Sequence, residues 1–574
     1  MDKKWVIAQP IKGELAAGYA QLHPVIAQLL FNRGLGPDQI NNFFSADNES
    51  QWHSPFAFKN MHAAVDLIVA KIKTGAKIAI CGDYDADGVT ASAVLAETLN
   101  TLKAQVEVWI PNRLTEGYGL NSRVLKEIKA AGCALVITVD NGIRSRAEIE
   151  SAKKLGLEVI VTDHHAAPDD QAEWPDCLII NPMMPDETYP FKFLAGVGVA
   201  FKLASALIEI SNLSPAIKER LANRVLDLVA IGTVADCVNL LGENRFLVRQ
   251  GLNEINRRGR VGLDQLIKTS QLSGDINAWN IGWQLAPRLN VAGRLDHANT
   301  AYEILVTTDA NEAATLAARL NDQNVKRQEE TQRLVDYCQK YVEANLADDK
   351  LLILTSPNIS DQTAEAWHEG VIGLVAGRLC ERYSKPTLVI TLSDGKLKGS
   401  GRSIEAYNIL SVLERNKQFL ERFGGHKAAC GFTVKDEANL SGFMTAARAL
   451  VKQELKDEAL VPSLKIDAEL DLTQVNEKLV EALERLAPFG QGNKEPLFVS
   501  FGLAVRDKMT MGFDGQHVKF KFNNFWALAF GEAAKWQDLA VGDKVDAVYT
   551  LEFNDYNGFR NIQMRLVDMK RSLA

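Results

Sequence analysis

The sequence is poor in cysteine, and none of its seven cysteines forms a CxxC pair. A scattered set fits neither a disulfide framework nor a zinc ribbon, and it is typical of a reducing compartment. The first lysines are not followed by the apolar stretch of a signal peptide. No uncharged apolar run approaches the ~18 residues that a membrane span needs. We therefore expect a cytoplasmic enzyme without a membrane partner.

The chain also lacks an excess of positive charge, since its formal net charge is −8. A polyanionic substrate would therefore have to be met by local cationic sites and not by a uniformly basic surface. Internal repeats and low-complexity segments are absent too. With 574 residues, the chain is long enough for three or four domains, each with its own core.

An acidic turn stands out near residue 83. The short apolar run 78–80 precedes Asp83, Asp85 and Asp87, and a segment with helical character follows. A strand, a tight turn and a helix place side chains at the carboxyl edge of a parallel sheet, where α/β folds bind ligands. Carboxylates suit Mg²⁺ or Mn²⁺. A solvated acidic turn is the alternative.

Further strands end in acids or histidines. The apolar runs 106–110, 134–139 and 159–162 alternate with helical segments, which indicates a parallel sheet covered on both faces. Asp140 follows the second run, and Asp163, His164 and His165 follow the third. These side chains should meet the acidic turn, because parallel strands end at one edge of the sheet.

Asp236 closes another apolar run, 225–235, and is either an exposed terminus or a further ligand. Together these acids and histidines could hold two divalent ions about 3.5–4 Å apart, which suits in-line phosphoryl displacement. An imidazole ligand would favour Mn²⁺. For the histidine pair alone, the competing interpretation is a cap on a strand.

The second half of the chain changes character twice. Residues 309–346 contain no glycine or proline and predict one helix of roughly 55 Å between domains. A second α/β unit follows, with two glycine-rich turns at 398–403 and 423–431. Past residue 461, alternating strands indicate a small β-barrel, with an oligonucleotide-binding (OB) fold as the first candidate. Its aromatic residues are candidates for base stacking or for barrel core: Phe520, Phe522, Phe525 and Trp526.

The expected fold class is α/β: a parallel-sheet phosphoesterase domain, a long linking helix, a second α/β domain and a C-terminal OB-like β-barrel. The expected domains are a helical N-terminal extension (1–55), the catalytic domain (56–308), the linking helix (309–346), a substrate-clamping domain (347–460) and the barrel (461–574).

Several motifs resemble the DHH phosphoesterase superfamily: DYDADG, PNR with EGYG, VDNG, DHH and GTVADCV. The segments WHEGVIGLVAGRL, GSGRS and FGGHKAACGF are similar to the DHH-associated domain. APRLNVAGRLDHA and the barrel resemble the RecJ family of single-strand-specific 5′→3′ DNA exonucleases. This resemblance implies two-metal hydrolysis that releases mononucleotides, in DNA repair and recombination.

The resemblance also implies roles for individual residues. His165 would contact the scissile phosphate or act as an acid, Asp83 would be a supporting or bridging carboxylate, and Asp163 is counted with them as catalytic. Cys81 stands where many members of the superfamily have a metal-binding histidine. A thiolate suits Mn²⁺ and Mg²⁺ poorly, so we expect Cys81 to be structural. The implied metal ligands are Asp85, Asp87, Asp140, His164 and Asp236.

Substrate phosphates need cationic partners, and planar guanidinium groups or glycine-rich turns can supply them. In this family such groups hold substrate phosphates, including the one at the 5′ terminus. For any single arginine, a surface salt bridge is the alternative. His426 is similar to a substrate-proximal histidine of the family, without an assigned role. The candidates are Arg113, Arg288, Arg294, Ser400, Arg402 and His426.

The leading hypothesis is an exonuclease that degrades single-stranded DNA, with a single-strand-binding protein and a helicase as possible partners of a monomer. The alternative is a phosphodiesterase for short oligonucleotides or cyclic dinucleotides. A barrel beyond the reach of a dinucleotide favours the former. A nucleic-acid scaffold with a dead catalytic unit is disfavoured, since the acids and both histidines are present.

Overall fold

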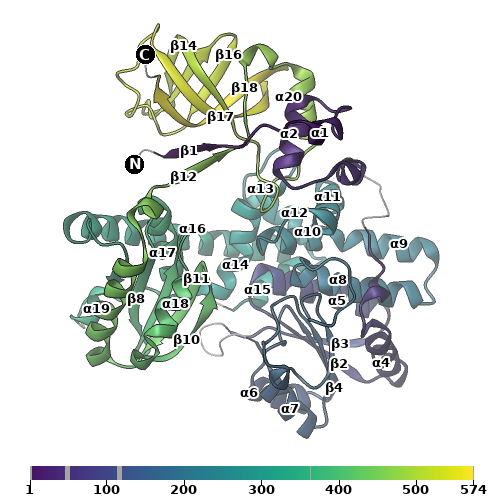
Figure 1. Cartoon of the computed structure of the whole chain (residues 1–574). Coiled ribbons are helices and arrows are strands. Elements are labelled where there is room, and N and C mark those ends of the chain that lie inside the picture. The colour runs from purple at the N-terminus through teal and green to yellow at the C-terminus, as the bar shows by residue number, and fades with distance from the viewer. Residues whose placement is uncertain are drawn as a thin grey trace. The chain divides into compact units, whose positions relative to one another are not determined.

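The computed structural model describes residues 3–45, 52–112, 119–295, 297–361, 363–556 and 558–572. It forms two compact units (Figure 1). The larger unit comprises Trp5–Asn290, Ala298–Ala317 and Lys465–Ala574. The smaller unit comprises Met1–Lys4, Val291–His297 and Ala318–Leu464. In the described part of the chain, no helix is both long and apolar enough to cross a bilayer.

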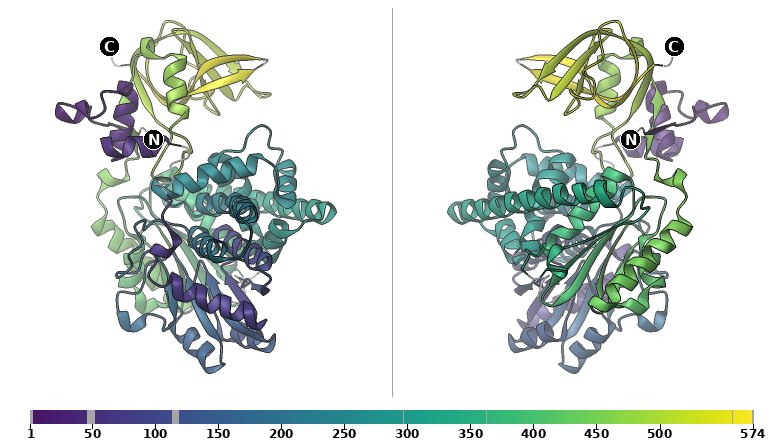
Figure 2. Two further views of the ribbon diagram at one scale, coloured as in Figure 1. Left: turned by 90° about the vertical axis from the view of Figure 1, so that its right-hand side faces the viewer. Right: turned by 90° about the vertical axis from the view of Figure 1, so that its left-hand side faces the viewer.

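The larger unit contains the predicted parallel sheet, with strand order β3-β2-β4-β5-β6. Its interior strands are continuous apolar runs because helices cover both faces (Figures 1 and 2). Helices α6 and α7 pack on the face that holds Ala79 and Val136. The bounds are β2 Lys77–Gly82, β3 Gln105–Trp109, β4 Cys133–Val139, β5 Glu158–Thr162, β6 Leu178–Ile180, α4 Met61–Thr74, α5 Ala86–Thr101, α6 Ser122–Ala130 and α7 Arg146–Lys154.

The register of this sheet brings the predicted site residues to the same level at its carboxyl edge. Gly82 of β2 pairs with Val139 of β4, and Val139 pairs with Thr162 of β5. The next residue of each strand is an aspartate. Asp83, Asp140 and Asp163 therefore leave the sheet side by side at its carboxyl edge.

A helical layer follows the sheet in sequence. Helix α10 is buried along its length before it ends at Asp236, which explains its unbroken apolar sequence. The bounds in this layer are α8 Gly196–Ile210, α9 Pro215–Arg224, α10 Leu226–Ala235, α11 Gly242–Asn256, α12 Val261–Thr269, α13 Ala278–Asn280, the π-helix η5 Ile281–Leu285, α14 Ala286–Leu295 and α15 Asn299–Val306.

The C-terminal strands form the predicted OB-like β-barrel. Their order is β13-β14-β15-β16-β18-β17, and a further pairing of β14 with β17 closes the barrel. The bounds are β13 Ala468–Glu469, β14 Phe498–Met511, β15 His517–Phe522, β16 Phe525–Ala529, β17 Lys544–Tyr556, β18 Phe559–Arg571 and α20 Glu477–Glu484.

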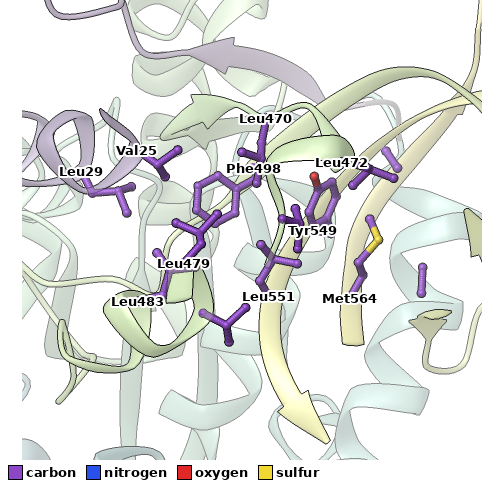
Figure 3. Packing of buried hydrophobic residues seen from close by; sticks show 14 of the residues in the cluster. Val25, Leu29, Leu470, Leu472, Leu479, Leu483, Phe498, Tyr549, Leu551 and Met564 are labelled. Carbon is purple, nitrogen blue, oxygen red and sulfur yellow. The ribbon is translucent and has the colours of Figure 1, made fainter. Parts of the chain in front are cut away.

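The N-terminal helices belong to the core of this barrel. Val25 and Leu29 of α2 lie beside Phe498 of β14, and Leu479 of α20 completes the contact (Figure 3). The expectation of a mere extension therefore missed their packing role. The bounds are β1 Lys4–Ile7, α1 Glu14–Ala17, α2 Pro24–Asn32, α3 Ile40–Phe44 and β12 Ser463–Ile466.

The smaller unit contains a mixed sheet with strand order β10-β11-β9-β8-β7, in which only β7 and β8 run parallel. The long helix predicted for 309–346 is α16, and its second half packs into the core of this unit through Leu334 and Cys338. The bounds are α16 Ala310–Asn345, β7 Leu352–Thr355, α17 Glu369–Tyr383, β8 Thr387–Ser393, β9 Lys396–Arg402, α18 Ile409–Arg415, β10 Leu420–His426, β11 Ala429–Val434 and α19 Glu437–Glu454.

Candidate metal centre and substrate surfaces

The acidic turn between β2 and α5 is held by its own backbone. The carboxylate of Asp85 caps α5, accepting hydrogen bonds from the amides of Asp87 (3.0 Å) and Gly88 (3.1 Å). A Cβ atom at Gly88 would lie 2.6 Å from backbone atoms of Asp83. Glycine is therefore required for the chain to fold back so closely.

Asp87 sits against the N-terminus of α8. Its two carboxylate oxygens accept hydrogen bonds from the amides of Gly196 (2.7 Å) and Val197 (2.8 Å), where the helix dipole favours a negative charge. Burial, followed by the charge of Asp85, nevertheless raises the pKa of Asp87 to about 7. The carboxylate of Asp87 is thus fixed in place by backbone amides, but these do not offset the cost of burying its negative charge.

Two glycines make room for the buried acids. A Cβ atom at Gly196 would lie 2.5 Å from Asp140, and one at Gly232 would lie 2.8 Å from Oδ1 of Asp87. Neither contact is possible for a larger residue without moving a carboxylate. Sequence reasoning missed both positions, because a glycine within a helix gives no local sign of what lies opposite.

His164 lies among three carboxylates. Its Nε2 atom is 3.1 Å from Asp140, 3.6 Å from Asp236 and 3.9 Å from Asp87. Burial lowers the pKa of His164 to about 4 and leaves a neutral imidazole, whose backbone hydrogen bond with Leu194 orients the ring. A neutral ring oriented in this way is the form that binds a metal.

The acids around His164 raise one another's pKa. Burial and the charges of Asp87 and Asp85 raise the pKa of Asp236 to about 9. The pKa of Asp140 is also well above its ordinary value, for the same reasons. Like charges crowded in a buried site need a cation among them to remain ionised together.

Asp163 holds His165 and does not point into this group of acids. Its Oδ1 atom accepts the amide hydrogens of both histidines (2.7 and 3.0 Å) and lies 2.8 Å from Nδ1 of His165. Burial opposes the protonated form of His165, but the hydrogen bond with Asp163 and the charges of Asp163, Asp236 and Asp87 together outweigh it and raise the pKa of His165 to about 9. The protonated ring is therefore favoured.

Among the residues that the structure describes, three sets of side chains could each hold a metal ion, with ligand atoms within 4.8 Å of one another. Asp140 is common to two sets, as is His164, so the sets form one continuous centre. The donors are carboxylates and the neutral imidazole of His164, which fit Mn²⁺ or Mg²⁺, whereas His165 would have to lose its favoured proton to bind a metal. The sets are Asp83, Asp85 and Asp140; Asp87, His164 and Asp236; and Asp140, His164 and His165.

Cys81 lies outside these sets. It is buried in the core between the sheet and helices α6 and α7, and burial raises the pKa of its thiol. This placement agrees with the structural role expected for it.

The predicted phosphate-binding residues are divided between the two units. Arg288 lies on α14 in the larger unit and donates to the carbonyl oxygen of Gln284 (2.7 Å). Arg294 lies in the smaller unit and donates to the carbonyl oxygen of Gly370 (3.1 Å). Arg113 lies outside the described residues. His426 is exposed at the end of β10.

Ser400 and Arg402 face the first turns of α17. A Cβ atom at Gly373 would lie 2.9 Å from Oγ of Ser400 and 3.2 Å from Nη2 of Arg402. A hydroxyl group, a guanidinium group and the N-terminal end of a helix thus converge in the smaller unit. Such a combination suits an anion.

Of the two predicted glycine-rich turns, the one at 398–403 is wrong, and the one at 423–431 is a hairpin whose turn is confined to residues 427–428. GSGR forms the end of strand β9, and FGGH forms strand β10, which pairs with β11 as a hairpin. The glycines of β9 serve packing: a Cβ atom at Gly399 would lie 2.2 Å from the ring of Phe432, and one at Gly401 would lie 2.5 Å from Sγ of Cys430. Close approach, and not a turn, requires them.

The aromatic candidates of the barrel fall into two groups, buried core residues and a residue on the outer face. Phe520 and Phe522 are fully buried in the core, so they cannot stack on bases. Their neighbours in β15 alternate outward, which places Lys519 4.5 Å and Lys521 5.8 Å from the ring of Trp526. Of the predicted stacking residues, only Trp526 carries cations over its ring on the outer face.

One further residue of the centre was missed. Asn290 of α14 accepts a hydrogen bond through Oδ1 from the amide of Ala86 (2.7 Å), between Asp85 and Asp87. It lies inside the PRLNVAGR segment, which drew attention for its arginines. Asparagine in a helix otherwise gives no signal of a contact so distant in sequence.

Adjoining carboxylate and imidazole sets at the edge of a parallel sheet define a metal-dependent phosphoesterase. Models of three families match the chain: the DHH family N-terminal domain over residues 77–233, the DHHA1 domain over 350–453 and the RecJ OB domain over 466–568. The chain belongs to the RecJ family of single-stranded-DNA-specific exonucleases.

Relatives match over most of their length. The chain is 35% identical to the single-stranded-DNA-specific exonuclease RecJ of Bacillus subtilis, over 98% of this chain and 70% of the relative. It is 32% identical to RecJ of Salmonella typhimurium, over 96% of both chains. The crystal structure of Thermus thermophilus RecJ in complex with Mn²⁺ matches with a TM-score of 0.82 and 30% identity, covering 100% of this chain and 80% of that one. A Mg²⁺ complex of the same protein also matches, with a TM-score of 0.76 and 28% identity.

Proposed function

We propose that this chain is a metal-dependent exonuclease that hydrolyses single-stranded DNA from the 5′ end and releases mononucleotides, in DNA repair and recombination. The observation that carries the proposal is the continuous centre in which Asp140 belongs to two of the three ligand sets. The family supplies the substrate class, since the named relatives are single-stranded-DNA-specific exonucleases.

In this proposal, Asp83, Asp85 and Asp140 hold one divalent ion, and Asp87, His164 and Asp236 hold the other. The chemistry that bound ions would supply is activation of a water molecule for attack on the phosphodiester and stabilisation of charge on the scissile phosphate. Gly196, Val197 and Asn290 keep the carboxylates in place.

We assign His165 to the scissile phosphate. Its Nδ1 atom is held by Asp163, so its Nε2 atom can donate a hydrogen bond to a phosphate oxygen. Asp163 is then a positioning residue, because it acts through His165. A donor fixed in advance costs no reorganisation when charge develops.

The polarity rests on the anion site of the smaller unit. Ser400, Arg402 and the first turns of α17 suit a terminal phosphate, and an Arg–phosphate pair contributes about 1.5–3 kcal/mol. We propose Arg113, Arg288, Arg294 and His426 as further phosphate contacts. We also propose that the chain acts as a cytoplasmic monomer, with a single-strand-binding protein and a helicase as partners.

The test compares matched oligonucleotides labelled at either end: single-stranded, duplex and dinucleotide, with a 5′ phosphate or a 5′ hydroxyl group. With Mn²⁺ or Mg²⁺ we expect single strands to be degraded from the 5′ end. The 5′ phosphate should raise the rate roughly tenfold, and Arg402→Lys should lose most of that gain, because lysine lacks the planar fork. Release from the 3′ end, or equal cleavage of duplexes, would contradict the proposal.

A further inference from the structure

Two tryptophans stand exposed on one helix of the larger unit. Helices α13, η5 and α14 follow one another without interruption, with a π-helical turn between α13 and α14, and residues 278–290 of this helix belong to the larger unit. The side chains of Trp279 and Trp283 are 55% and 70% exposed, whereas Ile281 and Leu285 are buried. The helix is thus anchored through one side and presents two indole rings to solvent from the other.

The rings stand on a firmly held segment beside polar groups. Asn277 and Asn280 cap the helix start reciprocally (3.0 and 2.9 Å). The side chain of Asn280 donates to that of Gln284 (2.8 Å), and Arg288 donates to the carbonyl oxygen of Gln284 (2.7 Å). Asn280, Gln284 and Arg288, spaced four residues apart, therefore form a polar and cationic stripe along the helix. Asn280 directly follows Trp279 in the sequence, and Gln284 directly follows Trp283.

The same helix packs against two elements that carry ligands of the metal centre. A Cβ atom at Gly282, next to Trp283, would lie 3.6 Å from Cγ1 of Val234, two residues before Asp236. At its other end, Asn290 binds the amide between Asp85 and Asp87. Trp283 precedes Asn290 by seven residues, which is about 10 Å along a helix axis.

We propose that Trp279 and Trp283 form a stacking platform for two bases of the single-stranded substrate as it leads to the metal centre. This inference rests on the proposed function. Aromatic rings interleaved with cationic and polar groups are how proteins hold single strands without reading their sequence. The neighbours Asn280, Gln284 and Arg288 supply the polar and cationic groups that a sugar–phosphate backbone beside the stacked bases needs.

The function of the platform follows from its place. An exonuclease must hold a strand of any sequence, and every base offers a π-face. Rings about 10 Å (Trp283) and about 16 Å (Trp279) along the helix from the residue that binds the Asp85–Asp87 turn would hold the bases near the scissile bond. The outer face of the barrel would contribute separately, through Trp526.

The experiment measures binding of a labelled single-stranded oligonucleotide to full-length chains that carry Asp140→Asn, so that the strand is not cut. Trp279→Ala and Trp283→Ala should each weaken binding about 5- to 150-fold. Trp→Phe should restore most of the affinity. Ile217→Ala, which removes another exposed apolar side chain, should leave it unchanged. Melting temperatures should not move, because both rings lie at the surface.

Abasic oligonucleotides identify stacking as the cause. Removing bases at the platform positions should weaken binding by the unsubstituted chain, and the double variant should be indifferent to their loss. Unchanged affinity of the Trp→Ala variants would overturn the platform. So would an abasic penalty that persists in the double variant, or a loss of self-association alone, which would assign the rings to a second copy of the chain.

The wild-type chain in the same series separates this inference from the proposed function. If it fails to degrade single strands, the proposed function fails. If it degrades them while the tryptophan variants bind normally, only the platform fails.

Discussion

The metal centre and the outer face of the barrel, both in the larger unit, are built in opposite ways. In the centre, buried carboxylates are fixed by backbone amides and by glycines that leave no spare room. On the barrel face, two lysines surround one partly exposed indole of Trp526. Catalysis needs the reacting atoms to be placed within a fraction of an ångström. Affinity for a single strand is instead the sum of many contacts that do not depend on base sequence or on exact geometry.

The largest effect should come from the acid shared between ligand sets. Asp140→Asn keeps the size of the side chain but removes the charge, so hydrolysis should fall below about a hundredth of the wild-type rate. The measurement is turnover of a single-stranded oligonucleotide with Mn²⁺, with circular dichroism as the check on folding. A folded variant that retains more activity would show that catalysis does not depend on Asp140.

Packing around the acids should matter nearly as much. Gly196→Ala would place a Cβ atom 2.5 Å from Asp140, and the displaced carboxylate should slow turnover on the order of ten- to a hundredfold. Gly198→Ala is the matched control in the same helix, since its Cβ atom would meet only the side chain of Leu194, at 3.3 Å. Equal rates for the two variants would mean that the centre tolerates displacement.

The barrel should show the opposite behaviour. Trp526→Ala should weaken binding of a long single strand by about 1–3 kcal/mol and leave the melting temperature unchanged. Phe520→Ala should cost about 3–5 kcal/mol of stability, because that ring is fully buried. Thermal melts and binding titrations of both variants test the distinction. It fails if Phe520→Ala weakens binding without lowering stability.

Titration of the metal-free protein should give the smallest effect. The pKa values of Asp236 and His165 are both raised to about 9, so the folded chain binds more protons than the unfolded chain between pH 6.5 and 9. Stability should therefore fall as pH rises through this window. The lowered pKa of His164 makes stability rise with pH, but only below pH 6.5, so it does not oppose the fall in this window.

Added Mn²⁺ should remove this fall, because metal ions bind the deprotonated ligands. The measurement is the melting temperature at pH 6.5, 7.5, 8.5 and 9, with and without the ion. Asp236→Asn should make the fall in the metal-free profile shallower and leave the part that is due to His165. Melting temperatures that rise with pH in the metal-free protein would contradict the electrostatic description of the centre.

Sequence periodicity predicted the parallel sheet because its strands are apolar on both faces. The run 134–139 became β4, Cys133–Val139, and 159–162 became β5, Glu158–Thr162. Because parallel strands end at one edge of a sheet, the sequence order alone was enough to predict that Asp83, Asp140 and Asp163 lie together. The register of β2, β4 and β5 shows why this worked.

The remaining features depend on contacts between residues far apart in sequence. The alternation in β15 was visible, but which of its faces is inside depends on barrel closure, so the sequence left stacking and barrel core as alternatives for Phe520 and Phe522. Glycines were interpreted as turns in β9, where Phe432 and Cys430 require them instead. Asn290 and Gly196 gave no local signal, because their partners lie on elements far away in the chain.

The most direct test of the central claim is the number of Mn²⁺ ions bound by each chain, measured by isothermal titration calorimetry. We predict two ions for the wild-type protein. Asp236→Asn should lose or weaken one of them, whereas Asp140→Asn should weaken both, since Asp140 is a ligand of one ion and lies 3.1 Å from His164, a ligand of the other. A wild-type chain that binds one ion, or an Asp140→Asn variant that binds two with unchanged affinity, would contradict the two-metal account.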